Sequence, residues 1–287
     1  MKKYRFTKRK IFDAHSHIGR FGPQKIKGKI INPFLDREID SAKEQKEYME
    51  KLGITEAIVM PHYVPDQKTP FDVYNPLVLD TILKLDNVYG ALWVSPLSQN
   101  SQKTRKVLES LPIKKIVALK ISPTSWPEKC SPDPATWNEK FRKNMEAIIE
   151  TAQDNNLVIQ THTGSGNSYI LEYIPFVKKY AKNLKIQFVH MGGSTSGHFV
   201  FIPLFIKWLK RGYDFYCDTS FCRSFAPAWL VREMQKEYPK SLNRILFGSD
   251  NPWGIFESEY WKVEAINCPE KIKEKIFYQN ANRLYGK

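Results

Sequence analysis

The amino-acid sequence predicts an α/β fold of the (β/α)8 (TIM) barrel type, on three observations. Eight short runs rich in β-branched and aromatic residues alternate with amphipathic stretches, which is the sequence form of repeated βα units. The runs are nearly continuously apolar, as expected for strands that are buried on both faces. The length of 287 residues suits one such barrel, which typically takes about 250 residues.

The predicted strands lie at 11–19, 54–62, 88–96, 116–123, 157–164, 185–193, 214–221 and 244–252. The predicted helices lie at 41–52, 75–86, 101–111, 138–154, 169–182, 199–211, 226–238, 256–266 and 269–279. Within 138–154, Phe141, Met145 and Ile148 recur at helical spacing, and Asn155 follows at the end. We therefore expect this apolar stripe to cover a barrel strand.

The chain is expected to form one domain over 1–287, with loop insertions at about 20–40 and 124–137. Both insertions leave the C-terminal ends of predicted strands. Loops at that end build the active sites of barrel enzymes, so both are candidate lids or substrate walls.

The composition, with 42% hydrophobic and 26% charged residues, is that of a soluble globular protein. No apolar run approaches the roughly 18 residues of a membrane span, and the N-terminus lacks the apolar region of a signal peptide. These features predict a cytoplasmic protein without a membrane partner. The four cysteines show no metal or disulfide spacing and are expected to be reduced thiols.

The net charge of +14 would attract anions, but its carriers are spread along predicted helices and loops. Most of these lysines and arginines are explained as residues on solvent-exposed faces of helices and loops. A nucleic-acid partner is disfavoured because no basic stripe is interleaved with aromatic residues. We expect a small-molecule substrate, and a homodimer stays open because Trp208, Trp229 and Trp261 lie on predicted helices.

Metal-ligand side chains gather at the C-terminal ends of the predicted strands. Because residues two apart in a strand share a face, a His-x-His pair offers two imidazoles to one ion. Imidazole with carboxylate suits zinc or another first-row divalent ion. The convergence of several strands on one barrel mouth predicts a metal site among these residues: His15, His17, His62, His162, His190 and Asp250.

Five motifs carry a resemblance to a known family. DAHSHIG, THTG, FVHMGG, LFGSDNPWG and the terminal NANRLYG occur in this order along nearly the whole chain. The sequence resembles the amidohydrolase superfamily, and within it the amidohydrolase-related (amidohydrolase 2) branch of metal-dependent hydrolases and decarboxylases. The resemblance implies a divalent metal bound by His15, His17 and His162, with Asp250 completing the set.

The same resemblance leaves the number of ions open between one and two. His190 is either a catalytic base or a ligand to a second metal. Lys120 stands where two-metal relatives place a bridging residue, in some of them a carboxylated lysine. It could equally stay an ammonium group that binds a substrate carboxylate. Zn²⁺ is the expected ion, with Mn²⁺, Fe²⁺ and Ni²⁺ as alternatives.

We expect a metal-dependent hydrolase whose activated water cleaves a C–N or C–O bond in an amide, cyclic amide or lactone. Asp250 would take a proton from that water and return it to the leaving group, and His190 would assist. The alternative is a non-oxidative decarboxylase, in which Asp250 or His190 protonates the carbon. A metal-dependent nuclease is disfavoured because such relatives usually carry glutamate in place of Lys120.

Four side chains are candidate substrate contacts: His62, Lys120, Arg223 and Trp253. Each also has a structural interpretation. His62 could bond a loop carbonyl, Arg223 could be a surface residue, and Trp253 could pack under the eighth loop.

Overall fold

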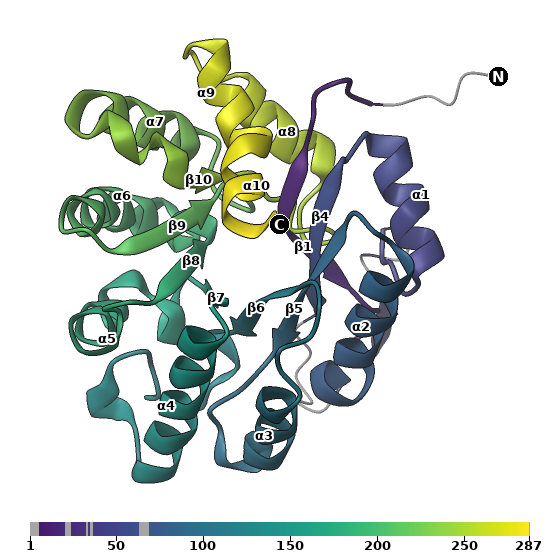
Figure 1. Cartoon of the computed structure of the whole chain (residues 1–287), viewed down its shortest axis with the longest axis vertical. Coiled ribbons are helices and arrows are strands. Elements are labelled where there is room, and N and C mark those ends of the chain that lie inside the picture. The colour runs from purple at the N-terminus through teal and green to yellow at the C-terminus, as the bar shows by residue number, and fades with distance from the viewer. Residues whose placement is uncertain (1–5, 21–23, 33, 35–36, 63–68, 287) are drawn as a thin grey trace.

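The computed structural model describes residues 6–20, 24–32, 34, 37–62 and 69–286. Eight parallel strands form one sheet in the order β1-β4-β5-β6-β7-β8-β9-β10, and helices surround it (Figure 1). Backbone hydrogen bonds from Ala14 N–H to the Phe247 carbonyl and from Asp250 N–H to the His15 carbonyl join the last strand to the first. The predicted (β/α)8 barrel is confirmed.

The barrel strands are short, and each lies within a predicted range. They are β1 (Phe12–Ile18), β4 (Glu56–Pro61), β5 (Val88–Trp93), β6 (Ile116–Ile121), β7 (Val158–His162), β8 (Lys185–Val189), β9 (Asp214–Asp218) and β10 (Ile245–Leu246). The insertion at 20–40 adds an antiparallel hairpin of β2 (Gln24–Ile26) and β3 (Lys29–Ile31). This hairpin was not predicted from the sequence.

The helices follow the predicted alternation. They are α1 (Ala42–Leu52), α2 (Asn75–Lys84), α3 (Ser101–Glu109), α4 (Glu139–Asp154), α5 (Tyr173–Tyr180), α6 (Thr195–Lys210), α7 (Phe225–Glu237), α8 (Phe256–Glu264), α9 (Glu270–Glu274) and α10 (Asn280–Tyr285). Side-chain caps set some of these starts. Ser41 accepts the Glu44 N–H before α1, and Asn138 accepts the Phe141 N–H before α4.

Three predicted helix boundaries need correction. The helix expected over 169–182 begins only at Tyr173, because the preceding residues form 3-10 turns. The helix expected over 199–211 begins earlier, at Thr195, because Ser194 accepts the Gly197 N–H as its cap. The helix expected over 269–279 passes through a π-helical turn and continues to Tyr285.

The barrel interior is closed at the N-terminal ends of its strands by α10, whose end lies near the centre of Figure 1. Tyr285 from α10 reaches inward and packs with Phe12 and Leu246. Its hydroxyl donates to the Gln187 side chain and accepts from Gln160 Nε2. One end of the barrel is therefore plugged, which leaves the C-terminal ends of the strands for a site.

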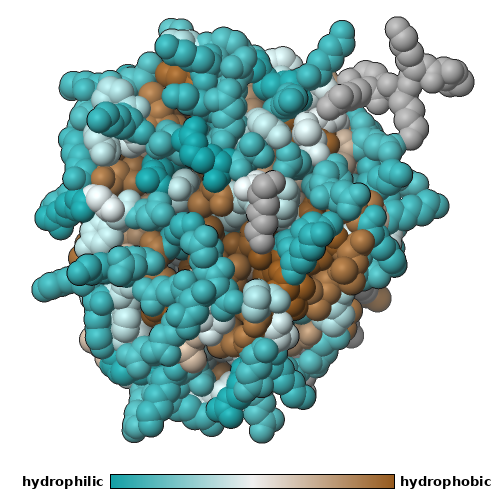
Figure 2. All heavy atoms as spheres, viewed as in Figure 1, coloured by the Kyte–Doolittle hydropathy of each residue, from teal (hydrophilic) through white to brown (hydrophobic). Residues whose placement is uncertain are grey.

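The face seen in Figure 1 is covered mainly by hydrophilic side chains, with an apolar area right of its centre (Figure 2).

Among the described residues, no helix is both long enough and apolar enough to cross a membrane.

Candidate metal centre

The His-x-His pair lies on β1 with both imidazoles buried. Nδ1 of His17 lies 3.0 Å from the Pro61 carbonyl oxygen, and Nδ1 of His15 lies 3.2 Å from Oδ2 of Asp218. Because a carbonyl and a carboxylate both accept, each Nδ1 carries the hydrogen. Each Nε2 therefore presents a lone pair, as metal-ligating histidines do.

Asp250 follows β10 and points its carboxylate at these two nitrogens. Its Oδ1 lies 3.1 Å from Nε2 of His17 and 3.4 Å from Nε2 of His15. The backbone of Asp250 has a φ of 53°, a left-handed conformation that is uncommon for a residue with a side chain. Neither of these Nε2 atoms carries a hydrogen, so a divalent cation, or a proton on Asp250, satisfies such a set of converging acceptors.

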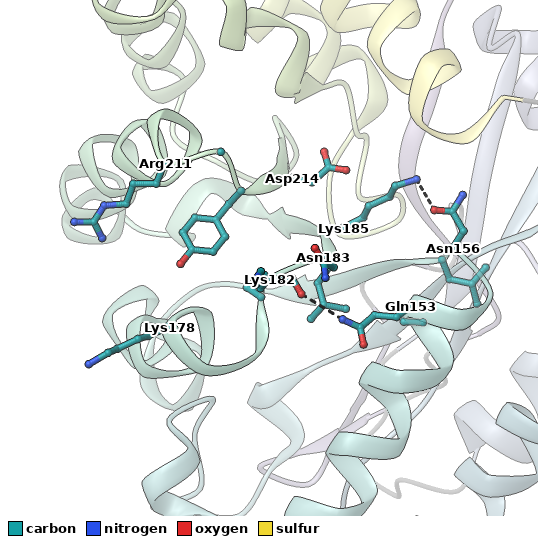
Figure 3. A pocket seen from close by; sticks show the side chains of 14 residues that line it. Gln153, Asn156, Lys178, Lys182, Asn183, Lys185, Arg211 and Asp214 are labelled. Atoms are coloured by element: carbon teal, nitrogen blue, oxygen red, sulfur yellow. Dashed lines mark hydrogen bonds between the residues drawn. The ribbon is translucent and has the colours of Figure 1, made fainter.

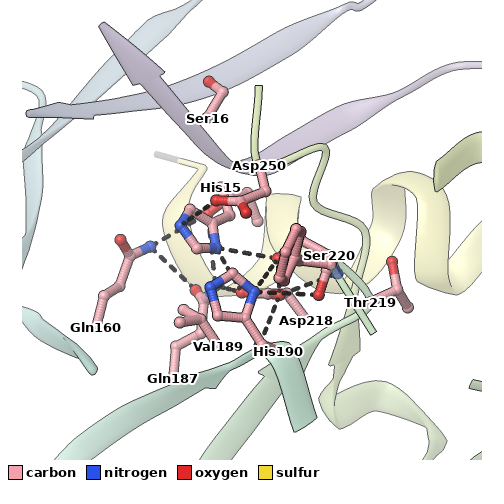
Figure 4. Close-up of polar contacts among 12 residues, drawn as sticks. His15, Ser16, Gln160, Gln187, Val189, His190, Asp218, Thr219, Ser220 and Asp250 are labelled. Atoms are coloured by element: carbon pink, nitrogen blue, oxygen red, sulfur yellow. Dashed lines mark hydrogen bonds and ion pairs between the residues drawn. The ribbon is translucent and has the colours of Figure 1, made fainter. Parts of the chain in front are cut away.

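His190 and Asp218 extend this group on the other side of His15. Figure 4 shows His15, His190, Asp218 and Asp250 gathered together. Nδ1 of His190 lies 3.1 Å from the Ser220 carbonyl, and its ring centroid lies 5.0 Å from that of His15. Asp218 also accepts from Gln187 Nε2 at 2.7 Å. Its carboxylate therefore links the imidazole of His15 to the barrel interior.

His162, the last residue of β7, lies beside His190 with ring centroids 4.8 Å apart. Among the described residues, two groups have potential ligand atoms within 4.8 Å of one another: His15, His17 and Asp250, and His15, His190 and Asp218. His162 belongs to neither. The structure thus brings three of the four predicted ligands into one compact group and leaves His162 at its edge.

Burial keeps the site histidines uncharged. Desolvation, reinforced by the nearby Lys120, lowers the pKa of His17 and of His162 to about 3. It lowers the pKa of His15 and of His190 well below the ordinary value. Neutral imidazole is the form that binds metal.

Burial also shifts the pKa values of Lys120 and Asp250. Desolvation lowers the pKa of Lys120 to about 8, although the carboxylates of Asp250 and Asp218 oppose this shift. Desolvation raises the pKa of Asp250 well above its ordinary value, with Lys120 opposing. Both groups can therefore exchange a proton nearer to neutral pH than in water.

A cavity of about 300 Å³ opens over this group of residues. Its lining combines the candidate ligands with aromatic walls and a lysine: His17, Trp93, Lys120, Ser122, Thr124, His162, His190, Phe221, Asp250 and Trp253. Lys120 and Trp253, two of the four predicted substrate contacts, lie in this lining.

The other two predicted contacts lie elsewhere. His62 is fully buried and stacks on His17 with ring centroids 5.2 Å apart, and its ring nitrogens bond no described group. Arg223 is exposed, and its backbone N–H donates to Nε2 of His198. Neither residue lines the cavity.

Asp218, Phe221 and Trp93 were missed as site residues by sequence reasoning. Asp218 ends β9 in the segment DFYCDTSF, so the rule that selected Asp250 at a strand end could also have selected it. Phe221 and Trp93 carry no such signal, since aromatic residues at strand ends are more often part of the core.

A second hollow, of about 570 Å³, lies between the ends of α4, α5 and α6, and four cationic side chains line it: Lys178, Lys182, Lys185 and Arg211. Figure 3 shows that Lys178 and Arg211 point away from Lys185, which donates to Asn156 Oδ1 at 2.7 Å. These cations do not converge on a point, so this hollow is not a candidate active site.

A family model described as amidohydrolase matches residues 12–287. The chain belongs to this family. No curated protein matches it in sequence. Family membership and the histidine and aspartate groups support a divalent metal at the mouth of the barrel.

Solved structures match over almost the entire chain at low sequence identity. A 5-carboxyvanillate decarboxylase from Sphingomonas paucimobilis has a TM-score of 0.68 at 12% identity, covering 96% of this chain and 98% of its own. A dihydroxybenzoic acid decarboxylase from Polaromonas, with bound manganese and 2-nitroresorcinol, has a TM-score of 0.67 at 16% identity, covering 96% and 97%. A manganese-containing 5-carboxyvanillate decarboxylase from Novosphingobium aromaticivorans has a TM-score of 0.67 at 13% identity, covering 97% and 96%.

The expectation of a hydrolase is wrong, because these full-length structural neighbours are decarboxylases. The physical reason is that a histidine and aspartate ligand set does not by itself select the reaction. Such a set can activate water, but it can equally bind an oxygen of a substrate carboxylate. What distinguishes the two reactions is the cavity around the ligands, which the sequence motifs do not describe.

Proposed function

We propose that this chain catalyses the metal-dependent, non-oxidative decarboxylation of a small aromatic carboxylate. The observation that carries the proposal is the cavity, in which one buried ammonium group and three large aromatic side chains surround the candidate ligands. An aromatic slot with one cation fits a planar anion. The decarboxylase neighbours support the reaction type.

The residues proposed to hold the metal are His15, His17, His162 and Asp250, with His190 beside them. Mn²⁺ is the first candidate because two of the neighbours contain it. Zn²⁺, Fe²⁺ and Ni²⁺ stay open, since nitrogen and oxygen ligands accept all of them. When bound, the ion would act as a Lewis acid toward a substrate oxygen.

Lys120 would bind and orient the substrate anion. It lies on β6 with only 2% of its surface exposed. No carboxylate of the described residues lies within ion-pairing distance of its Nζ atom, so its charge is available to a ligand. Trp93, Phe221 and Trp253 would hold the ring and exclude water.

Asp250 would supply the proton. Burial raises its pKa well above the ordinary value, so it holds a proton more readily than an exposed carboxyl group does. As the bond between the ring carbon and the carboxylate breaks, its electron pair stays on the ring carbon and CO₂ leaves. The proton from Asp250 then adds to that carbon, which balances the reaction without an oxidant or a reductant.

The test is CO₂ release by Mn²⁺-loaded protein from a panel that includes 2,6-dihydroxybenzoate and 5-carboxyvanillate. Asp250→Asn should abolish release, and Lys120→Met should raise KM. The matched control is Asp214→Asn. Asp214 begins β9, at the end of the barrel away from the cavity, so this variant should retain activity. If fully Mn²⁺-loaded protein released no CO₂ from any aromatic carboxylate, the proposal would be wrong.

A further inference from the structure

Phe221 lines the cavity in a backbone conformation that needs support. Its φ of 51° lies in the left-handed region, which is unfavourable for a bulky residue. The residue is 51% exposed, and its ring centroid lies 5.7 Å from that of His190 in an edge-on arrangement. Something outside the loop must therefore hold this residue in place.

That support comes from an ion pair on α8. The Phe221 N–H donates to Oε2 of Glu259 at 3.2 Å, and Nζ of Lys262 donates to the Cys222 carbonyl at 2.8 Å. Nζ of Lys262 lies 2.6 Å from Oε2 of Glu259, and the side chains of Glu259 and Lys262 are only 5% and 11% exposed. One buried ion pair thus holds both the N–H of Phe221 and the carbonyl of Cys222.

The same carboxylate side chain also packs against the loop that carries Trp253. A Cβ atom at Gly254 would lie 3.3 Å from Cγ and from Oε1 of Glu259, and 2.2 Å from the Ser249 carbonyl oxygen. Only a glycine fits between these groups. Glu259 therefore lies beside both loops that carry the partly exposed aromatic residues of the cavity, Phe221 and Trp253.

Stability alone is a poor reason for this arrangement. Removing two charges from water costs as much as their attraction returns, and a well-packed apolar pair would serve as well or better. What an apolar pair could not provide is the two hydrogen bonds to the backbone at 221 and 222. The value of the Glu259–Lys262 pair therefore lies in the geometry that it fixes.

We infer that Glu259 is a positioning residue, which together with Lys262 fixes Phe221 in the cavity wall and so sets the fit of a planar aromatic ligand. The ligand class rests on the proposed function. The positioning of the 221–222 backbone does not rest on it, because those contacts lie in the protein itself.

The first measurement is amide hydrogen exchange over residues 219–224. In Glu259→Gln, exchange at Phe221 should become about tenfold faster, since a buried acceptor loses its charge. Because this variant leaves Lys262 without its partner, a second variant, Glu259→Met with Lys262→Met, replaces the pair by apolar side chains and keeps the fold. Glu237→Gln breaks the exposed pair of Glu237 with Lys210 and is the matched control.

The second measurement is calorimetric binding of Mn²⁺ alone and then of 2-nitroresorcinol to the Mn²⁺-loaded protein. Both Glu259 variants should bind Mn²⁺ as the wild type does and 2-nitroresorcinol about tenfold more weakly, since small misplacements at a site are costly. Unchanged exchange at 219–224 would overturn the inference, as would unchanged 2-nitroresorcinol affinity or a parallel loss of Mn²⁺ affinity. Failure of the wild type to bind 2-nitroresorcinol would overturn the part of the inference that concerns a planar aromatic ligand.

Failure of the proposed function gives a different pattern. If the wild type released no CO₂ but the Glu259 variants still showed faster exchange and weaker 2-nitroresorcinol binding, the positioning role would be supported and only the reaction would be wrong.

Discussion

Nε2 of His17, which carries no hydrogen, lies 3.1 Å from Oδ1 of Asp250. The hydrogen of the imidazole is on Nδ1, which donates to the Pro61 carbonyl. A lone pair and a carboxylate oxygen at this distance repel one another unless Asp250 is protonated or a cation lies between them.

Mn²⁺ should therefore stabilise the folded protein. With free Mn²⁺ at a thousandfold excess over its dissociation constant, the gain in unfolding free energy is about 4 kcal/mol. His17→Ala should remove most of this gain, as measured by thermal unfolding with and without the ion. His198→Ala provides the comparison, because both nitrogens of that imidazole bond backbone groups, of Met191 and Arg223, and His198 belongs to neither group of potential ligand atoms among the described residues. Equal stabilisation of wild type and His17→Ala would refute the proposed ligand.

Asp218→Asn should weaken Mn²⁺ binding by about 10- to 100-fold, as is typical when the partner of a metal-bound imidazole is lost. The cause is the loss of the negatively charged acceptor for Nδ1–H of His15. Titration calorimetry with Mn²⁺ measures the effect. Asp214→Asn on the same strand should bind Mn²⁺ normally, since Asp214 pairs with Arg244 instead. If both variants bound alike, Asp218 would have no role in orienting His15.

The metal-free protein should lose stability as the pH falls below about 6.5. Burial lowers the pKa of His17 and of His162 from 6.5 to about 3. Between these values the unfolded chain binds protons that the folded chain does not, so unfolding is favoured as pH falls. Each such imidazole contributes about 1.4 kcal/mol per pH unit.

Urea unfolding at pH 7.0, 5.5 and 4.5 measures this slope. His17→Gln should have a shallower slope than the wild type, because one neutral buried imidazole is removed. A slope that did not change would show that His17 titrates normally in the folded state.

Gly193→Ala should destabilise the protein by about 2 to 3 kcal/mol. Gly193 has a φ of 67°, and a Cβ there would lie 2.8 Å from Cα of Gly164 and 2.9 Å from the Thr163 carbonyl. The clash would push on the loop that follows His162. Gly212→Ala separates backbone strain from the steric clash. That glycine has a φ of 85°, but nothing lies within 4 Å of the added atom.

Equal destabilisation of the two glycine variants in urea unfolding would mean that only backbone strain matters. A larger loss in Gly193→Ala, with weaker Mn²⁺ binding, is the expected result.

Much of the architecture follows from local sequence patterns. Apolar runs such as 116–123 and amphipathic stretches such as 138–154 predicted elements that lie at β6 and α4. The His-x-His pair and Asp250 were predicted to share one end of the barrel, because parallel strands align their C-terminal ends. The hydrolytic reaction was predicted wrongly, since ligand residues alone do not report the shape of the cavity above them.

What the sequence by itself determined is the order of the elements and the end of the barrel at which the metal-binding side chains gather. Periodicity and strand direction are properties of the local chain, so they can be read from it. Only the tertiary structure decided that Asp218 supports His15, that His62 lies behind His17, and that α8 holds Phe221. These contacts join residues far apart in sequence, and their geometry depends on how the helices pack around the closed barrel.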